Sequence, residues 1–177
     1  MPLSNIKVID LTRARSGPTC VRQLSQMGAQ VIKIEIPGSA DDLSGRHHFD
    51  FQNLHPSKRS LTLNLKEERG RDILLQLVKD ADVVVENFRP DVKRRLRIDY
   101  DTLSEINPRL VYASISGFGQ TGPDEGRPGL DQIAQGMSGV MTVNGQPGEG
   151  PMRIGLPAAD LNAGYMAAFG VVCALFE

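Results

Sequence analysis

The chain has 177 residues, enough to bury one sizeable core, and its 40% hydrophobic and 23% charged content is typical of a globular protein. Twenty basic residues against 21 acidic ones give a net charge of -1, which excludes the long-range positive field of proteins that bind nucleic acids or anionic membranes. The two cysteines form neither a metal-binding pattern nor a secreted disulfide framework, which favours a reducing cytoplasm.

The sequence indicates neither export nor insertion into a membrane. Residues 1–17 lack a basic region followed by a hydrophobic signal core. The uncharged apolar run at residues 161–176 has 16 residues and contains an asparagine and two glycines, which makes it short and broken for a membrane span. We therefore expect a cytoplasmic protein with neither a membrane nor a nucleic acid as partner.

The first 35 residues predict a strand, a helix and a second strand. An apolar run at 6–11 precedes a Ser-Gly-Pro break, an amphipathic stretch at 16–29 and a second apolar run at 30–35. A right-handed crossover makes two such strands parallel. Residues 37–60 then show little periodicity and contain all three histidines. Loops of this length are usually functional or disordered.

Strands and helices continue to alternate up to residue 119. The pattern predicts strands at 60–65, 82–87 and 110–119, a helix within 66–81, and short helices between 88 and 110. This alternation predicts an α/β fold, a Rossmann-like parallel sheet with flanking helices. Residues 119–157 are dense in glycine and proline, where backbone can approach a ligand closely.

Asp160 is the one acid in an otherwise apolar stretch before the last residue. In one interpretation a helix begins just after Asp160, whose carboxylate caps the helix N-terminus. In the other, small neighbours such as Ala159 and Gly164 let a substrate reach the carboxylate, which then acts as a covalent nucleophile. Spacing leaves both interpretations open.

Residues 16–20, SGPTC, follow the first strand and open the first helix, so their N–H groups suit a phosphate or a carbonyl. The segment lacks the second glycine of a dinucleotide-binding loop, which argues against NAD. No Walker A lysine motif is present, so the sequence does not support ATP use either.

Clustered basic residues suggest a phosphorylated ligand, because several of them follow strands, where open α/β sheets bind ligands. The alternative is that they only solvate helix faces. These residues are Lys58, Arg59, Lys66, Arg69, Arg71, Arg89, Lys93, Arg94, Arg95 and Arg97.

The histidines and cysteines do not predict a metal site or a reactive thiol. His47, His48 and His55 have no acidic or cysteine partner at ligand spacing, so we expect no metal. Cys20 is near a helix N-terminus, but no histidine is tied to it by sequence, so we expect it to be buried.

Six segments, taken in order, resemble the class III CoA transferases, a family that also contains formyl-CoA transferase, carnitine CoA transferase and α-methylacyl-CoA racemase. The segments are SGPTCVRQLSQMGAQVIKIE, NLHPSKRSLTLNLK, DVVVENFRPDVKRRL, INPRLVYASISGFGQTGP, RPGLDQIAQGMSG and AADLNAGYMAAFG. Members of the family are longer. The resemblance therefore implies that residues 1–177 are the N-terminal part of a Rossmann-like CoA-binding large domain, with the smaller second domain absent from this chain.

The resemblance also implies an interlocked homodimer and a role for each residue that matches the family pattern. Asp160 would be the nucleophile, forming aspartyl anhydride and aspartyl-CoA thioester intermediates between an acyl-CoA and a carboxylic acid. Residues Gly129, Leu130 and Asp131 would line the thioester end. Coenzyme A would be contacted by Arg15, Ser16, Leu63, Asn64, Lys66, Asn87, Phe88, Arg89 and Arg95.

Two positions depart from the family pattern. Ile36 stands where many members carry an arginine, so one contact on the adenosine side is expected to be lost. Leu130 stands where the racemases place a histidine, and without that base a two-base exchange of the α-proton has no partner for the carboxylate. We therefore expect a transferase. The alternatives are a racemase-type isomerase and an inactive CoA-binding fragment.

Overall fold

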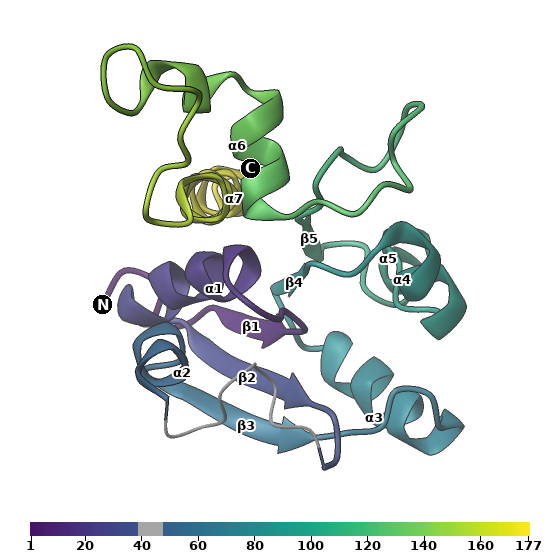
Figure 1. The fold of residues 1–177 in the computed structure, drawn as a ribbon. Helices are drawn as coiled ribbons and strands as arrows, with labels where there is room; N and C mark the ends of the chain where they lie inside the picture. The colour runs from purple at the N-terminus through teal and green to yellow at the C-terminus, as the bar shows by residue number, and fades with distance from the viewer. Residues whose placement is uncertain (39–47) are drawn as a thin grey trace.

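The computed structural model describes residues 1–38 and 48–177, and five parallel strands form its sheet in the order β3-β2-β1-β4-β5 (Figure 1). The strands are β1 (Lys7–Asp10), β2 (Gln30–Glu35), β3 (Lys58–Thr62), β4 (Val83–Glu86) and β5 (Val111–Ser114). The order changes direction between β1 and β4, which is the point where doubly wound sheets open a crevice for ligands. The predicted α/β fold with a parallel, Rossmann-like sheet is confirmed.

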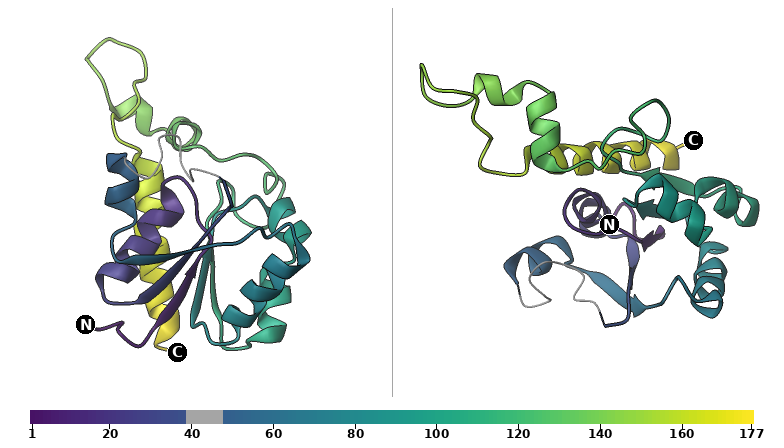
Figure 2. Two further views of the ribbon diagram at one scale, coloured as in Figure 1. Left: turned by 90° about the horizontal axis from the view of Figure 1, so that it is seen from below. Right: turned by 45° about the vertical axis from the view of Figure 1, so that its right-hand side comes forward.

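Helices cover both faces of the sheet (Figure 2). Helices α1 and α7 pack on one face, and α3 and α5 contribute to the core on the other. The helices are α1 (Ser16–Gln26), α2 (Phe49–Leu54), α3 (Glu68–Val78), α4 (Pro90–Leu96), α5 (Tyr100–Ile106), α6 (Asp131–Met137) and α7 (Ala158–Leu175), with a 3-10 turn η1 (Val140–Val143).

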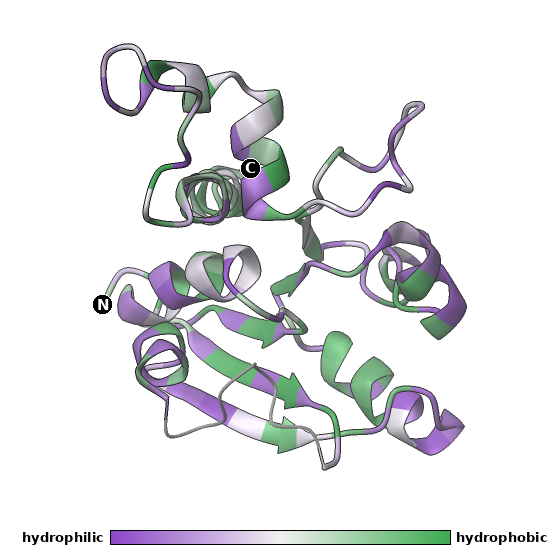
Figure 3. Cartoon of the chain, viewed as in Figure 1, coloured by the Kyte–Doolittle hydropathy of each residue, from purple (hydrophilic) through white to green (hydrophobic). Residues whose placement is uncertain are grey.

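The strands alternate between two cores, as the period of two in a β-strand requires. In β4, Val83 and Val85 join the core under α1 and α7, whereas Val84 joins the core under α3 and α5. Toward the carboxyl ends of the strands the α1 face becomes polar, with Asp10 and Lys33 both buried. Figure 3 shows green apolar and purple polar segments along these strands.

The interpretation of residues 37–60 as one loop was wrong, and the stretch 119–157, for which no element was predicted, also contains helical turns. Residues 37–60, interpreted as one loop, contain α2 and the first residues of β3, which begins at Lys58 and pairs only with β2. As an edge strand, β3 is partly solvated and carries little apolar periodicity. The glycine-rich stretch 119–157 contains α6 and η1, because its glycines lie mainly outside these short helical turns.

Helix α7 is apolar around most of its circumference (Figure 3). Its 18 residues have a mean hydropathy of 1.4, so length and composition alone would let it cross a membrane. Core helices of soluble proteins pass the same test, and α7 packs Ala168 and Val171 into the core beside α1. The expected absence of a membrane partner therefore stays a prediction.

Candidate active site

Two adjoining clefts open at the carboxyl ends of the strands. The larger, of about 600 Å³, lies beyond β2, β3, β1 and β4. The smaller, of about 190 Å³, lies between the segment after β5, the start of α6 and the start of α7, and contains Asp160. Residues Asn87, Phe88 and Arg89 line both clefts, so the segment after β4 is their common wall.

Most of the residues expected to contact coenzyme A or the thioester line one of these clefts. The larger cleft contains Leu63, Asn64, Lys66 and Arg95 in addition to the common wall. The smaller cleft contains Ser16, Gly129, Leu130, Asp131 and Asp160. Their roles in binding stay predictions, but the fold brings together segments that are far apart in the sequence.

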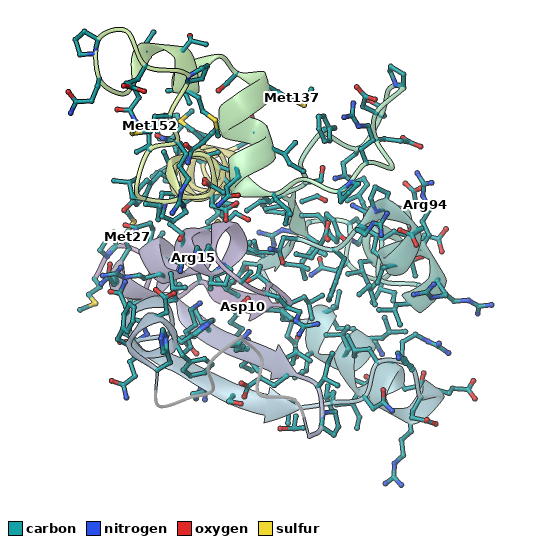
Figure 4. All side chains as sticks on the ribbon, in the orientation of Figure 1. Asp10, Arg15, Met27, Arg94, Met137 and Met152 are labelled. Carbon is teal, nitrogen blue, oxygen red and sulfur yellow. The ribbon has the colours of Figure 1, made fainter. Side chains whose placement is uncertain are left out.

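Arg15 differs from the other expected ligand residues, because it is not among the described residues that line either cleft. Its guanidinium pairs with the Asp50 carboxylate of α2, with 3.2 Å between Nη1 and Oδ1. Figure 4 labels Arg15 at the level of α1. The positive charge of Arg15 still lowers the pKa of Asp160. The effect of Arg15 on Asp160 is therefore electrostatic.

The larger cleft is basic although the whole chain is nearly neutral. Four cationic side chains and one carboxylate line it, namely Arg13, Lys66, Arg89, Arg95 and Glu35. Such a concave cationic surface attracts a phosphorylated ligand. Sequence interpretation missed Arg13, whose position directly after the first strand was the available signal. Ile36, which is exposed, lines this cleft at the position where the family often has arginine.

Two of the basic residues assigned to a phosphate-binding cluster cannot serve it. Lys93 is buried and its Nζ lies 2.9 Å from Glu86 Oε1 and 2.7 Å from Ser114 Oγ. The Lys58 side chain is 1% exposed and its Nζ lies 2.9 Å from Asp10 Oδ2. That part of the prediction was wrong, because buried carboxylates on β1 and β4 neutralise both ammonium groups.

The common wall of the clefts is held in place by side chains at the point where the sheet changes direction. Asn87 Oδ1 accepts a hydrogen bond from Arg13 N, and Asn87 Nδ2 donates to Arg13 O, each over 2.8 Å. Glu86 Oε2 accepts a hydrogen bond from Phe88 N over 2.8 Å. The Asn87 side chain thus joins the segments that follow β1 and β4.

Asp160 reaches the smaller cleft because α7 lies very close to α1. Gly164, one turn after Asp160, faces the first turn of α1, where an added Cβ would lie 2.5 Å from Ser16 O and 2.7 Å from Thr19 Cβ. Residues four apart share a helix face, so Asp160 points toward the N-terminus of α1. Ser16 and Asp160 accordingly line the same cleft.

The interpretation of Asp160 as an N-cap was wrong. Helix α7 begins at Ala158, before the aspartate, so Asp160 lies within the first turn. Asp131 of α6 supplies the cap instead, because its Oδ1 accepts hydrogen bonds from Ala159 N at 2.9 Å and Asp160 N at 3.2 Å. Among the described residues, none donates a hydrogen bond to the Asp160 carboxylate, which is partly buried.

The environment of Asp160 disfavours its charged form. Burial raises the pKa of the Asp160 carboxyl, the negative charge of Asp131 raises it further, and the positive charge of Arg15 offsets part of the increase. A carboxylate with a raised pKa is a stronger base and a stronger nucleophile than an exposed one. Such perturbed groups gather at functional sites.

A loop over residues 118–128 forms one side of the smaller cleft. Its ends meet where Gly117 and Gly129 pack back to back, since a Cβ on Gly117 would lie 2.2 Å from Gly129 Cα. Arg89 Nη2 donates to Gly126 O over 3.3 Å, which ties the loop to the common wall. From this loop, Glu125 and Arg127 line the cleft.

The histidines and cysteines show no sign of metal chemistry in the part of the chain that the structure describes. Within residues 1–38 and 48–177, no group of three or more His, Cys, Asp or Glu side chains is placed to hold an ion, and His47 lies outside these residues. His48 caps α2 through Nδ1. Cys20 is buried as expected, and burial followed by the charge of Asp10 raises the pKa of its thiol to about 12.

The fold and the carboxylate in its cleft define a Rossmann-like α/β protein with a ligand site at the strand ends, and comparison with known proteins identifies the family. Residues 3–177 match the model of CoA-transferase family III. The chain belongs to this family. It is 44% identical over 182 residues to an acetyl-CoA:oxalate CoA-transferase of Acetobacter aceti and 36% identical over 183 residues to a succinyl-CoA:glutarate CoA-transferase of Homo sapiens.

Solved structures agree with this assignment. A CAIB/BAIF family protein from Brucella suis is 37% identical and superposes with a TM-score of 0.90. The match covers 99% of this chain and 49% of that protein. The chain likewise covers 47% and 42% of the Acetobacter and human relatives, so it spans about half the length of the proteins that it resembles. It corresponds to their N-terminal part.

Proposed function

We propose that the protein containing this chain is a CoA transferase that moves coenzyme A between an acyl-CoA thioester and a free carboxylic acid, with Asp160 as the covalent nucleophile. One observation carries the proposal: the Asp160 carboxylate and the basic larger cleft share a wall, formed by residues 87–89. A ligand with a phosphorylated end in the larger cleft and a reactive end at Asp160 spans both.

Coenzyme A has the required shape and charge distribution. Its phosphates match the side chains of Lys66 and Arg89, which follow β3 and β4, and of Arg95 on α4. Its pantetheine arm would pass Phe88, which lines both clefts, and bring the thioester to Asp160. The N-terminus of α1 also lies beside Asp160, and its N–H groups favour negative charge that develops on a carbonyl oxygen.

The reaction exchanges one thioester for another through Asp160. A carboxylate oxygen attacks the thioester carbon, the C–S bond breaks, and CoA leaves as a thiolate from an acyl-aspartyl anhydride. The thiolate attacks the aspartyl carbon and releases the donor acid, which leaves an aspartyl-CoA thioester. The acceptor carboxylate repeats these two steps in reverse order and restores Asp160. No bond energy from ATP is required.

Dicarboxylic acids are the acceptor class that we favour. The relatives cited above are named for oxalate and glutarate, and the cleft of Asp160 also contains Arg127. Arg127 pairs with Asp124 at 3.2 Å and lies 4.9 Å from the Phe118 ring centroid, so its guanidinium has a defined place on the loop. The Arg127 guanidinium would pair with a second carboxylate on the acceptor.

A racemase-type isomerase is the second candidate, and Leu130 argues against it. Leu130 lines the cleft with Asp160 and is 64% exposed, so the position next to the carboxylate offers no base for the α-proton. Incubation of the full-length protein with a 2-methylacyl-CoA in deuterated water tests this candidate. Incorporation of deuterium at the α-carbon would support it.

The assembly and location of the full-length protein are also proposals. We propose an interlocked homodimer in the cytoplasm, in which the smaller domain and the partner subunit cover the open side of the clefts. Support comes from the family and from the exposed apolar side chains of α7, such as Met166 and Phe169. Water would then be kept from the anhydride, which hydrolyses readily.

Mass spectrometry of the full-length protein incubated with an acyl-CoA tests the mechanism directly. We expect a CoA adduct on the peptide that contains Asp160, and loss of both adduct and turnover in Asp160→Asn. Asp72→Asn, at an exposed position of α3 that is not among the described residues lining either cleft, is the control and should keep both adduct and turnover. An active Asp160→Asn enzyme would overturn the assignment of the nucleophile.

A further inference from the structure

Gln135 is a polar side chain on α6 that is 2% exposed and is not among the described residues that line the two clefts. A buried polar side chain of this kind is costly unless each of its groups has a partner. Gln135 lies one turn after Asp131 on the same helix. Sequence interpretation did not select it, although an i, i+4 spacing from Asp131 was the available signal.

The Gln135 amide group makes three hydrogen bonds that connect α6 to the segment leading into α7. Its Nε2 donates to Asp131 Oδ2 over 2.7 Å and to Leu156 O over 3.2 Å. Its Oε1 accepts a hydrogen bond from Ile154 N over 2.9 Å. One side chain therefore ties the first residue of α6 to the segment that leads into α7.

These hydrogen bonds continue to the nucleophile. While Asp131 Oδ2 is held by Gln135, its Oδ1 faces the backbone N–H groups of Ala159 and Asp160. A carboxylate bound at both oxygens cannot rotate freely. The orientation of the first turn of α7, and with it the position of the Asp160 side chain, thus depends on a residue that lies outside the cleft.

We propose that Gln135 is a positioning residue for the Asp160 nucleophile and acts through Asp131 and the segment 154–156. This inference rests on the proposed function. Loss of the Nε2 donor frees Asp131 to turn away from α7, and loss of the Oε1 acceptor releases Ile154 N. Both changes displace Asp160 relative to the thioester of an acyl-CoA whose phosphorylated end is held in the larger cleft.

Gln135→Met is the first test, because methionine preserves the side-chain volume and removes both hydrogen-bonding groups. In the full-length protein we expect kcat to fall by about 100-fold, because a displacement of the reacting group by about 1 Å can cause a loss of this size. The KM for acyl-CoA should not change, because the larger cleft is formed by other segments. Gln76→Met, at an exposed glutamine of α3, is the matched control and should leave kcat unchanged.

The pH dependence of the activity of Gln135→Glu distinguishes a positioning role from a purely structural one. A protonated carboxyl at position 135 can donate to Asp131, whereas an ionised one cannot and repels it. The activity of Gln135→Glu relative to wild type should therefore increase as the pH is lowered. Asp131 is the ionisable group that contacts this position, Asp160 and Arg153 belong to the segments packed next to it, and η1 has none. This variant decides the question if Gln135→Met does not fold.

Hydrogen exchange of the peptide that contains Ala159 and Asp160 separates this inference from the proposed function. We expect faster exchange in Gln135→Met than in wild type. Faster exchange with unchanged kcat, or no change in either, would overturn the positioning role while the transferase assignment stands. A wild-type protein with no turnover and no adduct would instead overturn the proposed function, and with it any nucleophile for Gln135 to position.

Discussion

Gly164 packs against Ser16 so closely that a Cβ at position 164 would lie 2.5 Å from the Ser16 carbonyl oxygen. Gly164→Ala should therefore push α7 away from α1 and destabilise the fold by about 1–3 kcal/mol. Urea unfolding measures the effect. Gly170→Ala on the same helix is the matched control, since nothing lies within 4 Å of a Cβ there, and it should stabilise α7 by up to about 1 kcal/mol.

Asp160→Asn should make the folded chain more stable at pH 7. Because burial and then Asp131 raise the pKa of Asp160 in the folded state, folding disfavours the ionised carboxylate. The stabilisation from Asp160 is complete below its unfolded pKa of about 3.9 and is lost as the pH rises through the folded pKa. The advantage of Asp160→Asn should consequently disappear in acid.

Thermal unfolding at a series of pH values measures this difference. Asp72→Asn, at an exposed position of α3, should change stability by no more than about 0.5 kcal/mol. A lower unfolding temperature for Asp160→Asn at pH 7 would show that the carboxylate is stabilised in the folded state, contrary to the raised pKa.

Lys93→Met should be among the most destabilising substitutions in the chain. It leaves the buried Glu86 carboxylate without its ammonium partner, at a cost of about 3–5 kcal/mol. The double variant Lys93→Met/Glu86→Gln should recover part of that loss, because it removes the unpaired charge. Denaturant unfolding checks both, with Arg94→Ala on the exposed side of α4 (Figure 4) as the control.

Arg127→Gln should raise the KM for a dicarboxylic acceptor by about 10–100-fold in the full-length protein, the loss expected for a charged hydrogen bond worth roughly 1.5–3 kcal/mol. A monocarboxylic acceptor of the same chain length should be unaffected. Steady-state kinetics with succinate and butyrate makes the comparison, and Arg109→Gln, in a distant cleft, is the control. An equal effect on both acids would argue against recognition of a second carboxylate.

The 177-residue chain alone should self-associate and show no transferase turnover. A helix that is apolar around most of its circumference needs partners on more than one side, yet Tyr165, Met166 and Phe169 of α7 are exposed. Met137 on α6 (Figure 4) is exposed as well. Light scattering over a range of protein concentrations tests the association, and a thioester-exchange assay tests the activity. A monodisperse, active fragment would contradict both expectations.

Local patterns in the sequence determined the strands, the main helices and the candidate residues. The apolar runs at 6–11 and 82–87 predicted β1 and β4, since a strand buried on both faces reads as a continuous apolar run. The resemblance to the CoA transferases brought Asn87 and Phe88 into consideration, and the one carboxylate in an apolar stretch brought Asp160. Helices, strands and their ends depend mainly on residues that are close in the chain, so local sequence patterns reveal them.

Only the tertiary structure decided which charges are available and which residue caps α7. The sequence suggested that Lys58 and Lys93 bind phosphate. In the structure they form buried ion pairs with Asp10 and Glu86. The sequence allowed Asp160 to be a helix cap. In the structure, Asp131, which lies 29 residues earlier, accepts the hydrogen bonds from the first turn of α7. Burial and long-range hydrogen bonds depend on contacts between distant segments, and no local pattern of residue types carries that information.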